Sequence, residues 1–131
     1  MIKSKKSIIE SRFLFRFITA CNKDLTTASG TITSPNYPSN YGDYSDCTTT
    51  VQVAPLTAKI TLTFTDFLTE PTYDVVNIYD GLVQTPDKLL LSASGYDLPA
   101  TVSTTGNSCL IRFVTDGAYN FKGWKLDYTS A

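Results

Sequence analysis

The sequence predicts an all-β fold, an antiparallel two-sheet β-sandwich. Three observations support this prediction: apolar and polar residues alternate with a period of two, turn signals separate the alternating segments, and no segment sustains a helical period over about a dozen residues. The chain of 131 residues suits one domain, and a domain of this size buries roughly two-thirds of its unfolded surface. We therefore expect one sandwich core.

Three segments show the alternation most clearly. Val51 and Val53 flank Gln52, a second run alternates Ile60, Leu62 and Phe64 with threonines, and a third alternates Trp124, Leu126 and Tyr128 with Lys125 and Asp127. Alternation directs one set of side chains to the core and the other to water. Further strands are expected at 74–79, 88–92, 101–104 and 108–115, with turn signals at 80–81, 95, 106–107, 116–117 and 122–123.

Composition excludes several classes of function. The chain has no histidine, so it cannot form a Ser-His-Asp or Cys-His catalytic site or a zinc site built on imidazole. No apolar run is long enough for a transmembrane helix. Residues 21–131 contain six bases and eleven acids, a net charge of −5, which repels nucleic acid and attracts cations or basic proteins. The alternative is an acidic surface that only aids solubility.

Residues 1–20 differ from the rest of the chain. They combine five bases, one acid and a short apolar run over 13–18, an arrangement similar to a secretory signal. Glu10, Arg12 and Arg16 interrupt it, and the same charges weaken the likeness of Ile18–Cys21 to a lipoprotein box. The alternatives are a truncated leader or an extra element packed on the domain. We divide the chain into a leader-like or N-terminal extension at 1–20 and a domain at 21–131.

Five sequence blocks carry a family resemblance. The run GTITSPNYPSNY at 30–41 lies between Cys21 and Cys47, and it is followed by FTDFLTE at 64–70, YD at 73–74 with YDG at 79–81, FVTD at 113–116 and GWKLDY at 123–128. In this order the blocks resemble the CUB domain over about residues 21–129. The resemblance implies a jelly-roll-like sandwich that is extracellular or secreted. It is also compatible with a module of a larger extracellular or cell-surface protein.

The resemblance also bears on the three cysteines. It implies a disulfide between Cys21 and Cys47, which would stabilise the domain by roughly 3 kcal/mol and requires an oxidising compartment. The second bridge usual in the family is missing, because no cysteine precedes Tyr73 and Ser94 stands where its partner would fall. Cys109 is in phase with apolar neighbours and is expected to be a buried, inert thiol. The alternatives are an intermolecular disulfide or a reactive nucleophile.

Two prolines shape the segment 34–41. Pro35 and Pro38 fix φ and remove two backbone donors, so this segment is expected to be a rigid loop at a sheet edge. Tyr37 and Tyr41 can bury their rings under the loop while their hydroxyls reach polar partners.

Many CUB domains hold a calcium ion, and the resemblance implies a ligand set here. It consists of Glu70, Asp74 and Asp116, with the Ala118 carbonyl as a further oxygen and Tyr41 hydrogen-bonded to the site. Calcium takes six to eight hard oxygens, so three carboxylates suit it. The loop from Glu70 to Asp74 is shorter than is common in the family and contains Pro71. It could therefore hold Glu70 too far away, leaving the acids scattered or capping turns.

The resemblance points to a function in binding. We expect an extracellular calcium-dependent protein-binding module whose acidic loop site recognises exposed Lys or Arg groups of a partner protein. The alternative is a calcium-independent CUB-type domain that binds carbohydrate or protein. We do not expect an enzyme: Glu70 and Asp74 could in principle serve glycoside hydrolysis, but the chain leaves no room for a deep cleft and shows no nucleophile motif.

Overall fold

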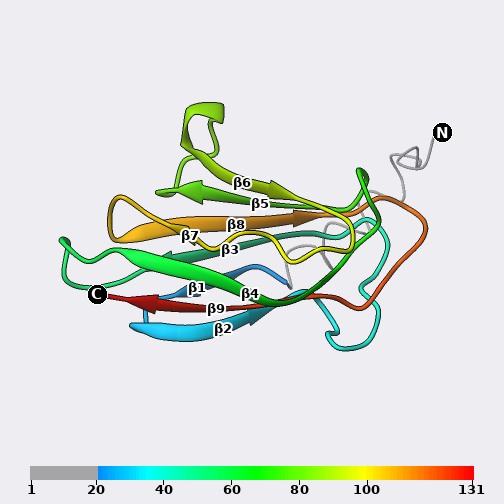
Figure 1. Ribbon diagram of the computed structural model, residues 1–131, viewed down its shortest axis with the longest axis horizontal. Helices are drawn as coiled ribbons and strands as arrows, with labels where there is room; N and C mark the ends of the chain where they lie inside the picture. The colour runs from blue at the N-terminus through cyan, green and yellow to red at the C-terminus, as the bar shows by residue number, and fades with distance from the viewer. Residues whose placement is uncertain (1–20) are drawn as a thin grey trace.

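The computed structural model describes residues 21–131 as two β-sheets packed face to face (Figure 1). The strand order is β1-β3-β8-β5-β6 in the first sheet and β2-β9-β4-β7 in the second. The predicted β-sandwich is confirmed. Its strands are β1 (Lys23–Leu25), β2 (Ser29–Thr33), β3 (Asp46–Gln52), β4 (Ile60–Leu68), β5 (Val75–Asp80), β6 (Leu89–Ala93), β7 (Val102–Ser103), β8 (Ser108–Val114) and β9 (Gly123–Ser130).

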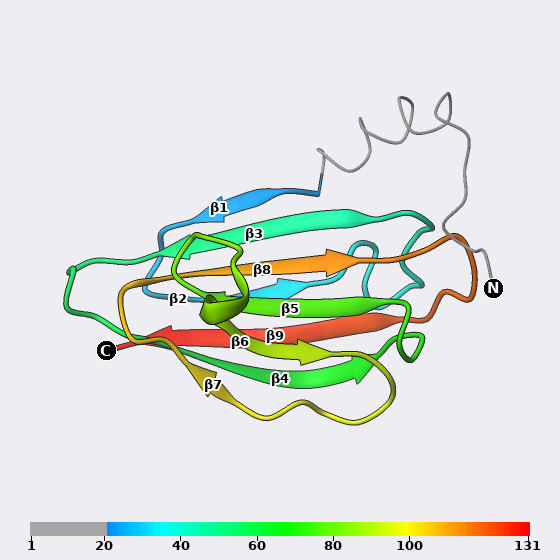
Figure 2. The same cartoon turned by 90° about the horizontal axis from the view of Figure 1, so that it is seen from above.

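One strand pair departs from the antiparallel prediction. Strand β1 runs parallel to β3, with Lys23 opposite Thr49, whereas every other described pair is antiparallel. The expected disulfide joins Cys21 to Cys47 with their Cα atoms 5.3 Å apart. Because the disulfide joins the chain just before β1 to the start of β3, both strands leave it in the same direction. Strand β1 is too short to show a pattern in the sequence, and it lies at the sheet edge (Figure 2).

Gly123 differs from its expected role in a turn. It is the first residue of β9, and its φ of +86° is unfavourable for other residues. A Cβ atom here would lie 1.9 Å from Oγ of Ser34. That hydroxyl oxygen accepts a 2.9 Å hydrogen bond from the Trp124 N–H, so glycine is needed for the close approach of this loop to β9.

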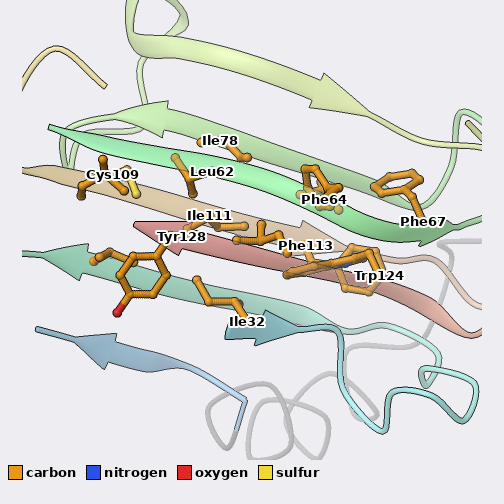
Figure 3. Packing of buried hydrophobic residues seen from close by; sticks show 14 of the residues in the cluster. Ile32, Leu62, Phe64, Phe67, Ile78, Cys109, Ile111, Phe113, Trp124 and Tyr128 are labelled. Atoms are coloured by element: carbon orange, nitrogen blue, oxygen red, sulfur yellow. The ribbon is translucent and has the colours of Figure 1, made fainter. Parts of the chain in front are cut away.

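Apolar side chains from both sheets meet in one core (Figure 3). The ring of Phe113 packs edge-on against the rings of Tyr41 and Trp124, with ring centroids 5.0 and 5.8 Å apart. The ring of Phe64 also packs edge-on against Trp124, with a centroid distance of 5.9 Å. Cys109 is free and fully buried. Burial raises the pKa of its thiol to about 12, so the thiol is protonated and unreactive at neutral pH, as expected for a core residue.

Four loops emerge at one end of the sandwich. They connect β2 to β3, β4 to β5, β6 to β7 and β8 to β9, and all lie at the right in Figure 1. Within residues 21–131 the one helix is the 3₁₀ turn Pro86–Lys88, and no helix there is long and apolar enough to cross a membrane. The expectations for residues 1–20 lie outside the described part of the chain.

Candidate metal site

Three acidic side chains meet at the end of the sandwich where these loops gather. Glu70, Asp74 and Asp116 are all buried and each offers an oxygen atom, with the three oxygens within 4.8 Å of one another. Glu70 follows the end of β4, Asp74 precedes β5, and Asp116 lies just beyond β8. Since β4 and β5 belong to different sheets, the loop between them crosses the sandwich and places its two acids between the layers. The three acids are therefore gathered, not scattered.

Asp74 joins three of the loops. Its Oδ2 accepts a 2.6 Å hydrogen bond from the Tyr41 hydroxyl, and its Oδ1 accepts a 3.0 Å bond from the backbone N–H of Asp116. Asp74 has no solvent exposure. Hydrogen bonds to a buried carboxylate are charge-assisted and stronger than neutral ones, so this side chain fixes the relative positions of the loops that contain Tyr41, Asp74 and Asp116.

Tyr41 forms hydrogen bonds with two of the three acidic residues. Its hydroxyl donates to Asp74 and accepts a 3.1 Å hydrogen bond from the backbone N–H of Glu70. Its ring is buried against Phe113. Burial, followed by the hydrogen bond to Asp74, raises the pKa of Tyr41 above its usual value, so the phenol is a protonated donor at any physiological pH. Tyr41 thereby couples the two acids of the β4–β5 loop.

The short β4–β5 loop keeps Glu70 close to Asp74. The Asp74 N–H donates to the Glu70 carbonyl at 3.1 Å, and Oγ1 of the fully buried Thr69 donates to the Asp74 carbonyl at 2.8 Å. Oγ1 of Thr69 also accepts a 3.0 Å bond from the N–H of Gly95. Sequence reasoning missed Thr69, because its role depends on contacts with a segment distant in sequence.

A hydrogen bond connects the two segments that the family's second disulfide would be expected to link. Oγ of Ser94 accepts a 2.8 Å hydrogen bond from the backbone N–H of Thr72. The N–H of Thr69 also donates to the Gly95 carbonyl at 2.9 Å. The β4–β5 loop is thus held against the β6–β7 loop without a cysteine.

Burial raises the pKa of Asp74 to about 6. The hydrogen bonds from Tyr41 and Asp116 oppose this shift, whereas the nearby charges of Asp116 and Glu70 reinforce it. The charged form of Asp74 is therefore disfavoured by its surroundings. A cation bound at the cluster would lower the pKa of Asp74, because it would stabilise the charged form of all three carboxylates.

The donor set fits a hard cation. All three groups are carboxylates, and Asp74 retains lone pairs on both oxygens after accepting its two hydrogen bonds. Calcium prefers oxygen ligands of this kind, whereas structural zinc sites rely on cysteine and histidine. The Ala118 N–H donates to Oδ1 of Asp116 at 3.4 Å, which places Ala118 beside the cluster. The role of its carbonyl as a ligand stays a prediction.

Comparison with known proteins identifies related sequences. A family model described as CUB domain matches residues 21–128. An astacin-like metalloendopeptidase of Gallus gallus is 34% identical over a match covering 85% of this chain and 28% of the relative. The chain therefore spans about a quarter of that protein's length.

The fold of this chain is also similar to solved structures. The MASP-1 CUB2 domain bound to Ca2+ is 31% identical with a TM-score of 0.70, and the match covers 82% of this chain and 96% of that one. The extracellular region of zebrafish Gpr126/Adgrg6 is 29% identical with a TM-score of 0.74, over 85% of this chain and 15% of that one.

Removing the Tyr41 hydroxyl tests the hydrogen bonds within the site. In Tyr41→Phe the Asp74 carboxylate and the Glu70 N–H each lose a buried partner, and an unsatisfied buried group costs about 1–3 kcal/mol. We expect the free energy of unfolding, measured by urea denaturation, to fall by about 2–4 kcal/mol.

Tyr37→Phe is the matched control. The Tyr37 hydroxyl also donates to an aspartate, Asp66, but this residue pair is only half-buried. Water can replace the lost partner there, so the expected cost is under about 1.5 kcal/mol. Equal losses in the two variants would contradict the assigned role of Tyr41.

Proposed function

Because this chain belongs to the CUB domain family, we propose that residues 21–131 form a calcium-dependent protein-binding module. CUB domains are non-catalytic interaction modules that occur in extracellular and cell-surface proteins. In the proposed mechanism Glu70, Asp74 and Asp116 hold a calcium ion, with the Ala118 carbonyl as a further ligand and Tyr41 orienting the site. Oxygens of this acidic loop site then accept a Lys or Arg side chain of a partner protein.

The convergence of the three buried carboxylates is the observation on which this proposal depends. Their oxygens lie within 4.8 Å of one another, although burial and mutual repulsion raise the pKa of Asp74. A bound calcium ion would offset that repulsion, because it attracts all three carboxylates. The related MASP-1 CUB2 domain was solved bound to Ca2+, which supports the choice of calcium as the cation.

The surface around the cluster supports recognition of a protein. Tyr73, Tyr96 and Tyr119 come from three loops at this end, and their exposed fractions are 47%, 63% and 64%. Tyrosine is enriched at protein–protein interfaces because its rigid ring buries a large area at low entropic cost. The negative charge of residues 21–131 favours encounter with a basic partner.

Calcium titration tests the ligand set. By isothermal titration calorimetry we expect one calcium ion to bind each chain, and Glu70→Gln or Asp116→Asn to weaken binding at least about tenfold, which corresponds to 1.4 kcal/mol. At calcium concentrations of 100 times the Kd, the parent should gain about 2.7 kcal/mol of stability.

Asp87→Asn is the matched control, because Asp87 is an exposed acid in the 3₁₀ turn, outside the four loops. It should bind calcium like the parent. Without calcium, Glu70→Gln and Asp116→Asn should still fold, since each keeps the shape of the side chain and removes a charge that repels Asp74. Unchanged calcium binding in both site variants would refute the ligand assignment.

A lysine-rich peptide tests the recognition of basic groups. We expect a Gly-Lys repeat peptide to bind the calcium-loaded chain, to dissociate with EDTA, and to bind more weakly as sodium chloride rises from 50 to 300 mM, because salt screens exposed charges. The same peptide with acetylated lysines is the control.

The outcome with EDTA separates the two candidate functions. Peptide binding that persists in EDTA, together with no calcium heat, would favour a calcium-independent CUB-type domain. Equal binding of the acetylated peptide would exclude recognition through lysine charge.

A further inference from the structure

A cavity opens between the two sheets, away from the acidic cluster. Its volume is about 340 Å³, within the size range of small-molecule sites. The walls come from the edge strands β1 and β2, from β3, which pairs with β1, and from the Cys21–Cys47 disulfide. The buried side chains Ile32, Ile111 and Trp124 line it, so a ligand in this cavity would contact an apolar interior.

The charge of the cavity wall is opposite to that of the domain. Among residues 21–131, Lys23 is the one charged residue that lines the cavity and no acid does so, although this part of the chain carries a net charge of −5. The alternation of β1 explains this arrangement: Lys23 and Leu25 both line the cavity, whereas Asp24 between them accepts a hydrogen bond from Thr50 Oγ1. The exposed Lys23 therefore combines a positive charge with an apolar interior.

A buried polar atom of Trp124, one of the residues that line the cavity, lacks a partner within the described chain. The indole nitrogen of Trp124 is buried and forms no hydrogen bond with any residue of 21–131. The whole residue is only 2% exposed. A buried N–H donor without a partner is costly. The residues that line the cavity therefore include a cation, apolar side chains and a tryptophan whose buried N–H has no partner within residues 21–131.

We propose that this cavity binds a small monocarboxylate with an apolar chain or ring. The apolar part packs against Ile32, Ile111 and Trp124, and a ligand oxygen accepts the indole N–H. Lys23 attracts the carboxylate from the outer side of the cavity. This cavity is separate from the acidic cluster, and the monocarboxylate binds to it without calcium.

Trp124 is the one tryptophan of the chain, so it reports binding directly. The probe is 4-phenylbutyrate, and 4-phenylbutyramide is its uncharged counterpart of nearly equal size. In EDTA-containing buffer we expect the acid to change the tryptophan emission and to shift the single indole N–H signal in a proton–nitrogen NMR spectrum. The acid should bind about tenfold more tightly than the amide, the factor that corresponds to 1.4 kcal/mol.

Two lysine substitutions distinguish the cavity from general charge effects. Lys23→Gln should remove the preference for the acid over the amide, whereas Lys59→Gln, at an exposed lysine outside the cavity wall, should retain it. Both residues are exposed, so both variants should fold. No change in emission or indole signal at millimolar acid would overturn the proposal, as would equal affinity for acid and amide or an unaltered preference in Lys23→Gln.

Discussion

The loops at one end of the sandwich are arranged around the buried carboxylate of Asp74. One of its oxygens binds the Tyr41 hydroxyl and the other binds the backbone of Asp116. Glu70 is brought in by the same tyrosine, and Thr69 links this group to Gly95 in a fourth loop. A charged group without solvent exposure must keep its hydrogen bonds. Loops from both sheets therefore adopt one arrangement around it.

The sandwich provides the frame for that arrangement. The disulfide joins the chain before β1 to the start of β3, and Gly123 permits the close contact between Ser34 and the start of β9. The ring of Tyr41 packs on Phe113 of the core. Because rigid core residues hold the ring, its hydroxyl is positioned before any ligand binds. A cation would then bind a largely preformed site, with little ordering cost.

Much of the fold follows from the sequence, whereas the site follows from it only in part. Period-two alternation and turn residues predict the long strands, but three residues of β1 are too few to show a pattern. Alternation does not predict which loops lie together, because it is a local pattern. Tyr41 and Asp74 are 33 residues apart in the sequence, and Asp74 and Asp116 are 42 residues apart. Only the family resemblance grouped these acids. The contacts of Thr69 and the inter-sheet cavity depend on tertiary packing and carry no local signal.

A crystal structure of the chain grown with calcium would show whether the three acids hold an ion. We expect one ion at the loop end, within about 2.3–2.6 Å of an oxygen from each of Glu70, Asp74 and Asp116. The Tyr41 hydroxyl should still contact Asp74. An ion bound elsewhere, or carboxylates that stay without one at saturating calcium, would rule out Glu70, Asp74 and Asp116 as the calcium ligands.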